Sequence, residues 1–425
     1  MATTTLRREM EYVAPTRQRV MGGIFVAAGL IIWWFFSRAV EPDAVTKFGM
    51  TSGGLKSTMP DLVIPTQLTL NILAIACVAL GIYQLARPQG FGRRTNLVLG
   101  LVAAMFVLAF LTWAAAGKSL NLAGLFNSTL SKAVPLTLGA LSGILCERAG
   151  VINIAIEGMM LMGAMTGALV GSITGSLWIG LLAAVLSGLV LGLVHGVLAI
   201  KYKTNQIISG TAINIFATGL TSYVSARFMQ SYQELNNPGT FGPWEIPGLS
   251  SIPFFGPILF NNNVFVYSMF IFLFLIQFGL FYTRWGLRHR AVGEHPRAAD
   301  TLGINVFRTR YIAVFLGSMM AGFAGGYFTL GAVGRFDEVM TAGRGFISLA
   351  AMLFGNYMPF GAFGAGLLFG FTDALATRLA ILGVRIPSQF LLMTPYIVTM
   401  VVLAGVVGRA QVPAADGVPY EKEGG

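Results

Sequence analysis

A few polar side chains lie inside long apolar stretches of the sequence, where they could bind a polar solute. They are Asn153, Glu157, Thr211, Asn214 and Asp373. An intramembrane carboxylate is costly, so it is usually paired or lines a water-filled path. Asn153 and Glu157 are four residues apart, so we expect them to project from one helical face. Two interpretations stay open for Glu157 and Asn214: a buried structural hydrogen bond near a helix end, or a translocation path.

The segment "RAVGEHPRAADTLGI", residues 290–304, is polar and basic and lies between two long apolar runs. Pro296 suits the first turn of a helix, and Gly303 suits the position just past its end. A helix of about two turns is marginal in water and gains definition by docking onto something. We therefore expect a short docking helix for a partner that supplies energy. The alternative is a solvated basic loop that only fixes membrane topology.

Motifs of catalysis are absent from the sequence. There is no HExxH, CxxC or G-x-S-x-G, and "GGLKST" at 53–58 lacks the spacing of a nucleotide-binding loop. Three histidines and two isolated cysteines, Cys77 and Cys146, favour neither a transition-metal site nor a disulfide framework. We expect His195 to be a packed, neutral histidine. The chain is therefore predicted to be no enzyme itself and to hold no cofactor and no metal.

The composition places these residues in a membrane protein. Of the 425 residues, 55% are hydrophobic and 11% are charged, whereas soluble domains carry about 25% charged residues. Apolar runs near the length that crosses a bilayer as a helix recur along the chain. They lie near 20–37, 67–86, 96–116, 133–146, 154–175, 177–199, 205–229, 263–283, 311–331, 345–357, 360–377 and 388–408. We predict an all-α polytopic membrane protein with about 10–12 transmembrane helices.

Two of these runs, 133–146 and 345–357, are short and suggest half-helices or re-entrant segments. The stretch "GVINIAIEGMMLMGA" from Gly150 also resembles "GFISLAAMLFGNYMPFGA" from Gly345 in outline. The two stretches are expected to run in opposite directions. Inverted repeats with broken helices are a common transporter architecture, so the sequence suggests one here.

The distribution of basic residues predicts the orientation. The net charge of +11 would suggest nucleic acid in a soluble protein, but here it is assigned to topology and no nucleic acid is expected. With the N-terminus in the cytoplasm, 18 of the 28 Lys and Arg residues fall on the cytoplasmic side. The predicted parts are a cytoplasmic segment 1–19, a transmembrane extension 20–116, a transmembrane core 117–408 with a cytoplasmic loop 284–310, and a cytoplasmic tail 409–425.

The glycines and the longest external connection have structural interpretations. Gly163, Gly167, Gly171 and Gly175, and then Gly188, Gly192 and Gly196, recur every four residues and predict close helix packing. Residues 230–262 are rich in proline and should form an ordered extracytoplasmic loop with short helical turns. Its aromatic residues Phe241, Trp244, Phe254 and Phe255 are expected either at the lipid headgroups or on a docking surface for a soluble partner.

Three separated motifs carry a family resemblance. "GLRHRAVGEHPRAADTLGINVFRTRYIAV" resembles the cytoplasmic coupling loop of bacterial ABC-importer permeases for branched-chain amino acids, simple sugars and nucleosides. "LSGILCERAGVINIAIEGMMLMGA" and "TAGRGFISLAAMLFGNYMPFGAFGAGLLFG" are similar to two further signatures of that group. "IPGLSSIPFFGPILF" resembles a loop of its nucleoside subgroup, which is linked to lipoproteins of the basic-membrane-protein type. The resemblance covers about 130–412, and residues 1–115 depart from the compact pattern.

The resemblance implies a transmembrane permease subunit of an ATP-driven importer in the cell membrane. The implied partners are ABC ATPase subunits, a second permease subunit, identical or different, and an extracytoplasmic substrate-binding lipoprotein. The residues that it implies for coupling to the ATPase are Glu294, Pro296, Arg297, Ala298, Asp300 and Gly303. For the substrate path we expect Asn153, Glu157, Thr211 and Asn214. Replacing Arg297 with Glu should cut uptake and leave membrane insertion intact.

The substrate is expected to be a small neutral polar solute, because few charged residues fall inside the spans. The nucleoside subgroup resemblance puts nucleosides first, simple sugars second and branched-chain amino acids third. A function of another class stays open, an ion-coupled secondary transporter or channel in which Glu157 and Asp373 are the ion-coupling sites. A membrane-embedded enzyme is a third possibility, which the missing catalytic motifs disfavour.

Overall fold

The computed structural model describes residues 15–51, 59–87, 89–383, 393 and 411–422. The chain divides into two compact units, Met1–Ala123 with Leu379–Arg385 and Gly124–Arg378 with Ile386–Gly425. Within the described ranges, ten helices are long and apolar enough to cross a membrane. This confirms an all-α polytopic membrane protein. The predicted span 388–408 lies outside the described residues, apart from Met393.

The first unit is a three-helix group with a small sheet. Its elements are α1 (Pro15–Ile31) with the π-helical turn η1 (Ile32–Ser37), α2 (Thr66–Ala86), η2 (Gly92–Arg94), α3 (Thr95–Ala114), β1 (Val45–Gly49), β2 (Leu62–Pro65) and β3 (Ser119–Asn121). The sheet order is β2-β1-β3, with β1 antiparallel to β2 and parallel to β3. Phe25, Leu70, Cys77 and Val102 form its core.

The second unit begins its helical core with α4 (Leu122–Glu147), which has 26 residues. The prediction of a short segment at 133–146 is therefore wrong. Hydropathy missed the first half of this helix because it carries polar residues, among them Asn127, Ser128 and Lys132. In the fully formed helix Asn127, Ser128 and Lys132 are half-buried, and most of the residues after them are buried.

Three helices form the tightest part of this unit. They are α5 (Ile156–Thr174), α6 (Leu177–Gly196) continued by η3 (Val197–Lys201), and α12 (Val306–Gly326) continued by η6 (Tyr327–Val333). A methyl group on Gly163 would lie 2.5 Å from the Gly322 carbonyl oxygen, so these backbones touch. The predicted glycine packing is thus confirmed for the helices. Gly175 is an exception, because it ends α5 with φ +64° instead of lying on its face.

Two further helices, α7 (Gln206–Val224) with η4 (Ser225–Met229) and α9 (Val264–Tyr282), flank residues 230–262. This connection contains η5 (Gln233–Asn236), β4 (Trp244–Glu245), α8 (Phe255–Leu259) and β5 (Asn261–Asn262). Short helical turns were expected there and are confirmed. Phe241 packs against Trp178 and Phe265, whereas the Trp244 side chain is 71% exposed.

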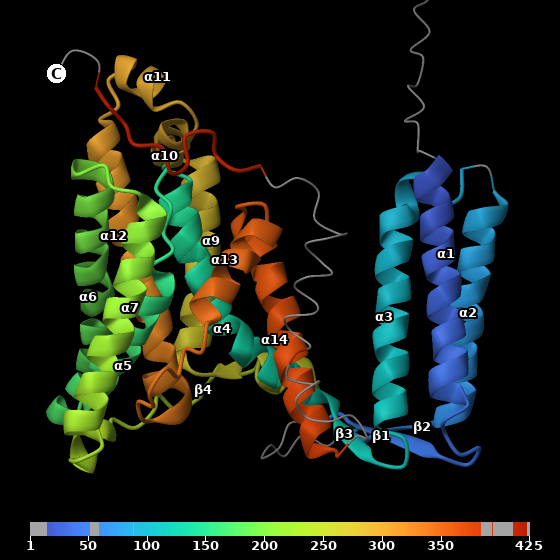
Figure 1. The fold of residues 1–425 in the computed structure, drawn as a ribbon. Helices are drawn as coiled ribbons and strands as arrows, with labels where there is room; N and C mark the ends of the chain where they lie inside the picture. The colour runs from blue at the N-terminus through green and yellow to red at the C-terminus, as the bar shows by residue number, and fades with distance from the viewer. Residues whose placement is uncertain (1–14, 52–58, 88, 384–392, 394–410, 423–425) are drawn as a thin grey trace, which may run out of the picture. The chain divides into compact units, whose positions relative to one another are not determined.

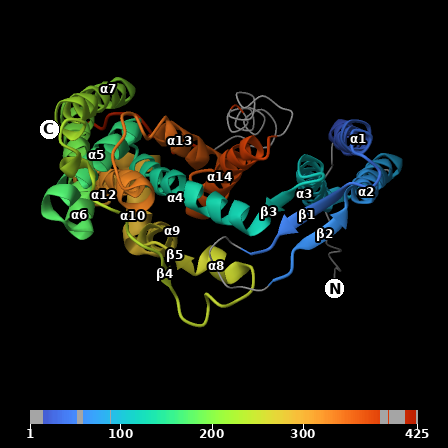
Figure 2. The same ribbon diagram turned by 90° about the horizontal axis from the view of Figure 1, so that it is seen from below.

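The remaining helices are α10 (Arg284–Glu294), α11 (Pro296–Thr301), α13 (Arg344–Phe354) and α14 (Pro359–Ile381). Helices α10 and α11 lie at one end of the second unit, which we call the α11 end, and residues 411–422 cross the same end (Figure 1). Figure 2 shows α4 passing close to α13 and α14. The short helix predicted near 345–357 is confirmed, because α13 has 11 residues.

The directions of α5 and α13 follow from their neighbours on α4. Gly139 lies against Ser348 and Met160, and four residues later Gly143 lies against Met352 and Ile156. Helix α13 therefore runs parallel to α4, and α5 runs antiparallel to it, so the two candidate repeat stretches have opposite directions. The inverted repeat itself stays a prediction.

Candidate functional site

Three charged side chains from three helices meet inside the second unit. We call Lys132 (α4), Arg344 (α13) and Asp373 (α14) the charged cluster. Lys132 Nζ lies 3.0 Å from Asp373 Oδ1, and Arg344 Nη2 lies 3.6 Å from Asp373 Oδ2. Their side chains are 28–31% exposed. Charged groups in membrane spans avoid lipid, so their open sides are expected to face water, solute or another subunit.

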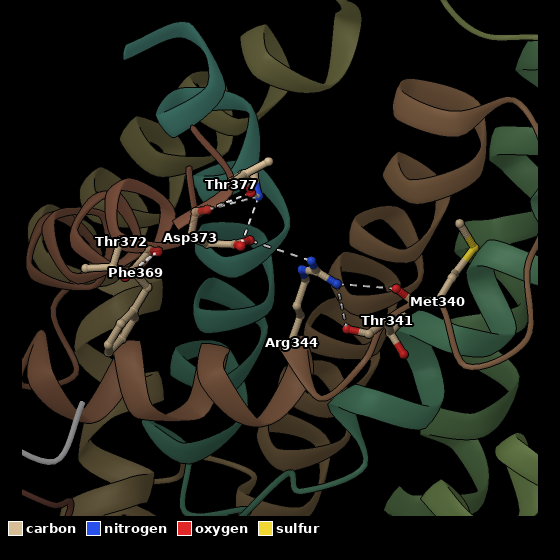
Figure 3. Close-up of polar contacts among 8 residues, drawn as sticks. Met340, Thr341, Arg344, Phe369, Thr372, Asp373 and Thr377 are labelled. Atoms are coloured by element: carbon tan, nitrogen blue, oxygen red, sulfur yellow. Dashed lines mark hydrogen bonds and ion pairs between the residues drawn. The ribbon is translucent and has the colours of Figure 1, made fainter. Parts of the chain in front are cut away.

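Arg344 joins this cluster to an irregular stretch of backbone. Figure 3 shows its guanidinium between Asp373 and the carbonyls of Met340 and Thr341, which accept hydrogen bonds from Nη1 at 3.4 and 3.3 Å. Residues 334–343 are not helical, and Val339 has φ +54°, a strained value for a β-branched residue. Residues 334–343 therefore interrupt the helical path between η6 and α13, and we call α13 the broken helix.

Glu157 stabilises the same start of α13 from the opposite side. Its Oε1 accepts hydrogen bonds from the Thr341 hydroxyl at 2.6 Å and from the Gly343 amide at 2.9 Å. Its Oε2 accepts from the Gly345 amide at 2.6 Å. Gly343 directly precedes α13 and Gly345 lies in its first turn, where helix donors lack internal partners. Of the two interpretations of Glu157, this geometry supports the structural hydrogen bond.

The two asparagines hold the start of α5. Asn214 Oδ1 accepts from the Gly158 amide at 2.7 Å, and its Nδ2 donates to the Ile154 carbonyl at 2.9 Å. Asn153 precedes α5, so the expectation that it shares a helical face with Glu157 is wrong. Residues 151–153 are not helical, and residues 154–155 form the turn that leads into α5. Asn153 is fully buried and its Nδ2 contacts the Cys146 sulfur at 3.6 Å.

Thr211 lies apart from these residues. It is exposed on α7, and its hydroxyl donates to the Ile207 carbonyl of its own helix at 2.9 Å. The structure thus brings Glu157 and Asn214 together at the start of α5 but leaves Thr211 outside. His195 is fully buried between Ser209 and the Ile152 carbonyl, which confirms a packed histidine.

The segment 284–310 is mostly helical, which corrects the prediction of a loop with one short helix. Thr283 caps α10 through a hydrogen bond from the Gly286 amide to its hydroxyl at 3.1 Å. His289 of α10 is fully buried, and its Nε2 lies 2.8 Å from the Leu145 carbonyl at the end of α4. Burial lowers the pKa of His289 to about 4, so it stays neutral and α10 is fixed to α4 at physiological pH.

Helix α11 begins and ends as the sequence predicted. Pro296 occupies its first turn, and Gly303 has φ +81° just after it. Arg297 and Ala298 are exposed, and Asp300 is half-buried. Glu294 differs, because it is the last residue of α10 and its Oε2 accepts from the Ala414 amide at 3.1 Å.

Leu302 is a feature of this surface that the sequence reasoning missed. Its side chain is 82% exposed on the turn that ends α11. Single exposed apolar side chains are common on protein surfaces, so Leu302 is of interest here only because it directly follows α11. In the sequence, Leu302 could have been noticed as a single leucine inside the polar run "RAADTLG".

A buried group of polar side chains lies beneath the α11 end and was also missed. The Glu147 carboxyl, at the end of α4, is hydrogen-bonded to the Asp416 carboxyl and the Tyr357 hydroxyl and accepts from the Asn153 backbone N–H. Arg148 Nε donates to the Tyr357 carbonyl at 3.2 Å. Burial raises the pKa of Asp416 to about 7.

The missed charges had a common signal, since each borders an apolar run. Lys132 and Arg344 directly precede the apolar runs 133–146 and 345–357, and Glu147 and Arg148 directly follow the first of them. No group of three or more His, Cys, Asp or Glu side chains that could hold a metal occurs in the part of the chain that the structure describes. Cys77 and Cys146 are both buried as free thiols.

Comparison with known proteins gives consistent matches. Residues 125–409 match the family model described as branched-chain amino acid transport system / permease component. The guanosine ABC transporter permease protein NupQ of Bacillus subtilis is 41% identical over 304 residues, 69% of this chain and 95% of the relative. The nucleoside ABC transporter permease protein NupC of Lactococcus lactis is 38% identical over 68% of this chain and 93% of its own length.

A third relative is named for glucose. A putative glucose ABC transporter permease protein of Haloferax volcanii is 35% identical over 71% of this chain and 98% of its own length. No solved structure matches the chain.

Proposed function

This chain belongs to the permease-component family of branched-chain amino acid transport systems, and we propose that it imports nucleosides as the membrane subunit of an ATP-driven transporter. The family supplies the class of protein, a multi-pass permease. Two relatives named for guanosine and nucleosides favour a nucleoside cargo. A simple sugar is the second candidate, because one relative is named for glucose.

The observation that carries the coupling part of this proposal is the exposed tip of α11. Arg297 and Ala298 are exposed on α11, a helix of six residues, and the exposed Leu302 follows directly after its last residue. Helix α10 below them is fixed to the end of α4 by His289. A partner that pushes on α11 would therefore move α4 as a rigid body. An ATPase subunit outside the membrane needs such a connection to transmit its movement to the membrane helices.

The same argument gives the orientation. An ATPase subunit binds ATP in the cytoplasm, so the α11 end and both chain termini are placed there, in agreement with the 18 basic residues on that side. We assign residues 20–116 to a transmembrane extension and 117–408 to the permease core. The core is paired with a second permease subunit, identical or different, and ATP hydrolysis is assigned to the ATPase.

The opposite end of the second unit suits a soluble donor of substrate. A polar hollow of ≈ 700 Å³ lies where α7 and α12 end, lined by Gln230, Asn237, Arg335 and Asp337 among others. Polar side chains at such a surface form the hydrogen bonds of a wet, reversible interface. We assign this end to an extracytoplasmic substrate-binding lipoprotein.

Inside the membrane, we assign the substrate path to the charged cluster. Two cations and one carboxylate offer more hydrogen-bond donors than acceptors, which suits the hydroxyl and carbonyl oxygens of a nucleoside. The secondary-transporter alternative needs carboxylates free to bind ions. Glu157 is occupied by three donors and Asp373 by two cations, which disfavours that alternative.

The proposal is tested by purifying the tagged chain from its native membranes in mild detergent. We expect the wild-type chain to bring an ATPase subunit, a permease and a lipoprotein. Leu302→Asp and Arg297→Glu should lose at least 90% of the ATPase and keep the lipoprotein. Leu249→Asp, a change of another exposed leucine at 42% exposure, is the control and should retain the ATPase. Recovery of the wild-type chain alone, reproducibly, would contradict the proposal.

A further inference from the structure

The C-terminal segment, residues 411–422, contacts several elements of the α11 end. The Gln411 amide donates to Asn356 Oδ1 at 2.7 Å, in the turn between α13 and α14. The Ala415 amide donates to the Gly293 carbonyl at 2.9 Å, close to the junction of α10 and α11. The segment therefore links α10 to the turn that follows the broken helix α13.

Helix α12 is joined to the same segment. The Arg310 side chain is only 2% exposed, and its Nη1 donates to the Val418 carbonyl at 2.9 Å. Asp416, two residues earlier, is hydrogen-bonded to Glu147 of α4. A buried arginine and a pair of carboxyl groups thus tie the middle of the segment to the ends of two membrane helices.

The end of the segment lies under α11. Tyr420 is 6% exposed, and its ring centroid lies 5.4 Å from that of Phe307 in α12. Its apolar neighbours in one small cluster are Val292, Ala299 and Val306, which belong to α10, α11 and α12. Ala299 is the one buried residue of α11, so Tyr420 completes the surface on which this helix rests.

These contacts of the C-terminal segment bear on the stability of α11. Helix α11 has six residues, and a helix so short is not stable by itself. A push on an undocked helix would be lost in local unfolding, because weakly packed elements open at low free energy. The coupling surface therefore needs a support that connects it to α4 and α12.

We propose that the C-terminal segment is this support, and that Tyr420 and Ala415 position α11 so that ATPase movement reaches α4 and α12. The inference rests on the proposed coupling function of α11. It assigns to residues 411–422 a role in energy coupling, with Tyr420 and Ala415 as positioning residues that touch neither solute nor nucleotide.

The first test measures the support itself, in the purified full-length chain without any partner. Amide hydrogen–deuterium exchange of residues 295–304 is compared in the wild type, Tyr420→Ala and Ala415→Pro, the second of which removes the amide that donates to Gly293. We expect exchange at least 10-fold faster in both variants and unchanged exchange in α5 and α6. Tyr420→Phe keeps the ring and should restore protection. Val412→Ala, at a 52% exposed position of the same segment, is the control.

The second test measures coupling in membranes that contain the whole transporter. We expect Tyr420→Ala to lower guanosine taken up per ATP hydrolysed at least fivefold, at wild-type levels of membrane insertion. Unchanged exchange in 295–304 would overturn the inference, and so would faster exchange with an unchanged uptake-to-ATP ratio. If Leu302→Asp also left ATPase binding and uptake intact, the proposed function of α11 would fail as well, and the two failures are thereby distinguished.

Discussion

At the scale of single residues, the charged cluster shows how a membrane span accommodates charge. Asp373 faces Lys132 at 3.0 Å and Arg344 at 3.6 Å, so one carboxylate partners two cations. The Arg344 guanidinium also lies 5.6 Å from the Phe328 ring centroid. Arg344 therefore has more than one favourable neighbour, and all three side chains of the cluster stay partly exposed.

Removing the carboxylate of Asp373 should lower the stability of the protein. Asp373→Asn leaves two cations unpaired, and we expect a loss of about 1–3 kcal/mol, between the values for exposed and buried pairs. Thermal unfolding followed by intrinsic fluorescence in detergent measures this loss. Arg335→Gln, which breaks an exposed pair with Asp337, should change stability little.

A double variant separates a structural role from a role in transport. Lys132→Gln combined with Asp373→Asn removes both charges, so we expect most of the stability to return. Uptake of guanosine should stay at least fivefold below wild type, because only Arg344 of the three charged groups remains in the path. Recovery of both stability and uptake would mean that the cluster only holds the helices together.

Asp416 gives the α11 end a predicted pH dependence. It faces Glu147 of α4, Arg310 of α12 and Tyr357, and burial raises its pKa from 3.8 to about 7. The docked segment thus prefers the protonated acid, so docking is strongest below about pH 4 and weakens as pH rises to about 7. Above that pH no further change is expected.

The measurement for this prediction uses a fluorophore on Val412→Cys. The native thiols Cys77 and Cys146 are buried, so the new thiol is the accessible one among the described residues. Anisotropy should fall between pH 5 and pH 7 as the segment loosens. Asp416→Asn cannot titrate and should flatten this profile, and an equal fall in that variant would refute the assignment to Asp416.

At the scale of elements, α11 could be predicted from sequence and α10 could not. Pro296 favours the start of α11 and Gly303 favours its end, and both preferences come from local backbone geometry. Residues 284–294 instead carry charges that suggest a solvated loop, and their helix depends on contacts far away in sequence, such as His289 with Leu145. Tertiary contacts of that kind leave no local pattern.

Replacing Gly303 tests how the end of α11 is stabilised. Its φ of +81° is open to glycine, and a side chain there would meet no atom within 4 Å, so strain would come from the backbone alone. Gly303→Ala should weaken the end of α11 by about 1–2 kcal/mol and lower uptake severalfold at normal membrane levels. Gly242→Ala, at an equally open position without positive φ, is the control, and equal uptake by the two variants would refute the prediction.

Near the broken helix α13, too, local features could be predicted from sequence and contacts between distant residues could not. The short apolar run of α13 predicted its short length. The full length of α4, 26 residues, could not be predicted because Lys132 interrupts its apolar run. Asp373 was recognised as an intramembrane charge, but its partners come from helices distant in sequence. Distant pairings such as these had to come from the structure.

At the scale of the whole molecule, composition alone determined the class of protein. A chain with 55% hydrophobic and 11% charged residues had to be a membrane protein, and ten spanning helices are found in the described ranges. The substrate is decided by few contacts within a path, which composition does not encode. Relatives named for nucleosides and for glucose share the same family, so the cargo needs a direct measurement.

That measurement is uptake of radiolabelled guanosine by cells that lack this chain, complemented with the wild type or with Leu302→Asp. The account predicts that the wild type restores uptake, that unlabelled adenosine or cytidine competes, and that glucose and leucine do not. Uptake should need ATP and should be lost in the variant. Competition by glucose alone, or uptake that follows an ion gradient and persists in Leu302→Asp, would contradict it.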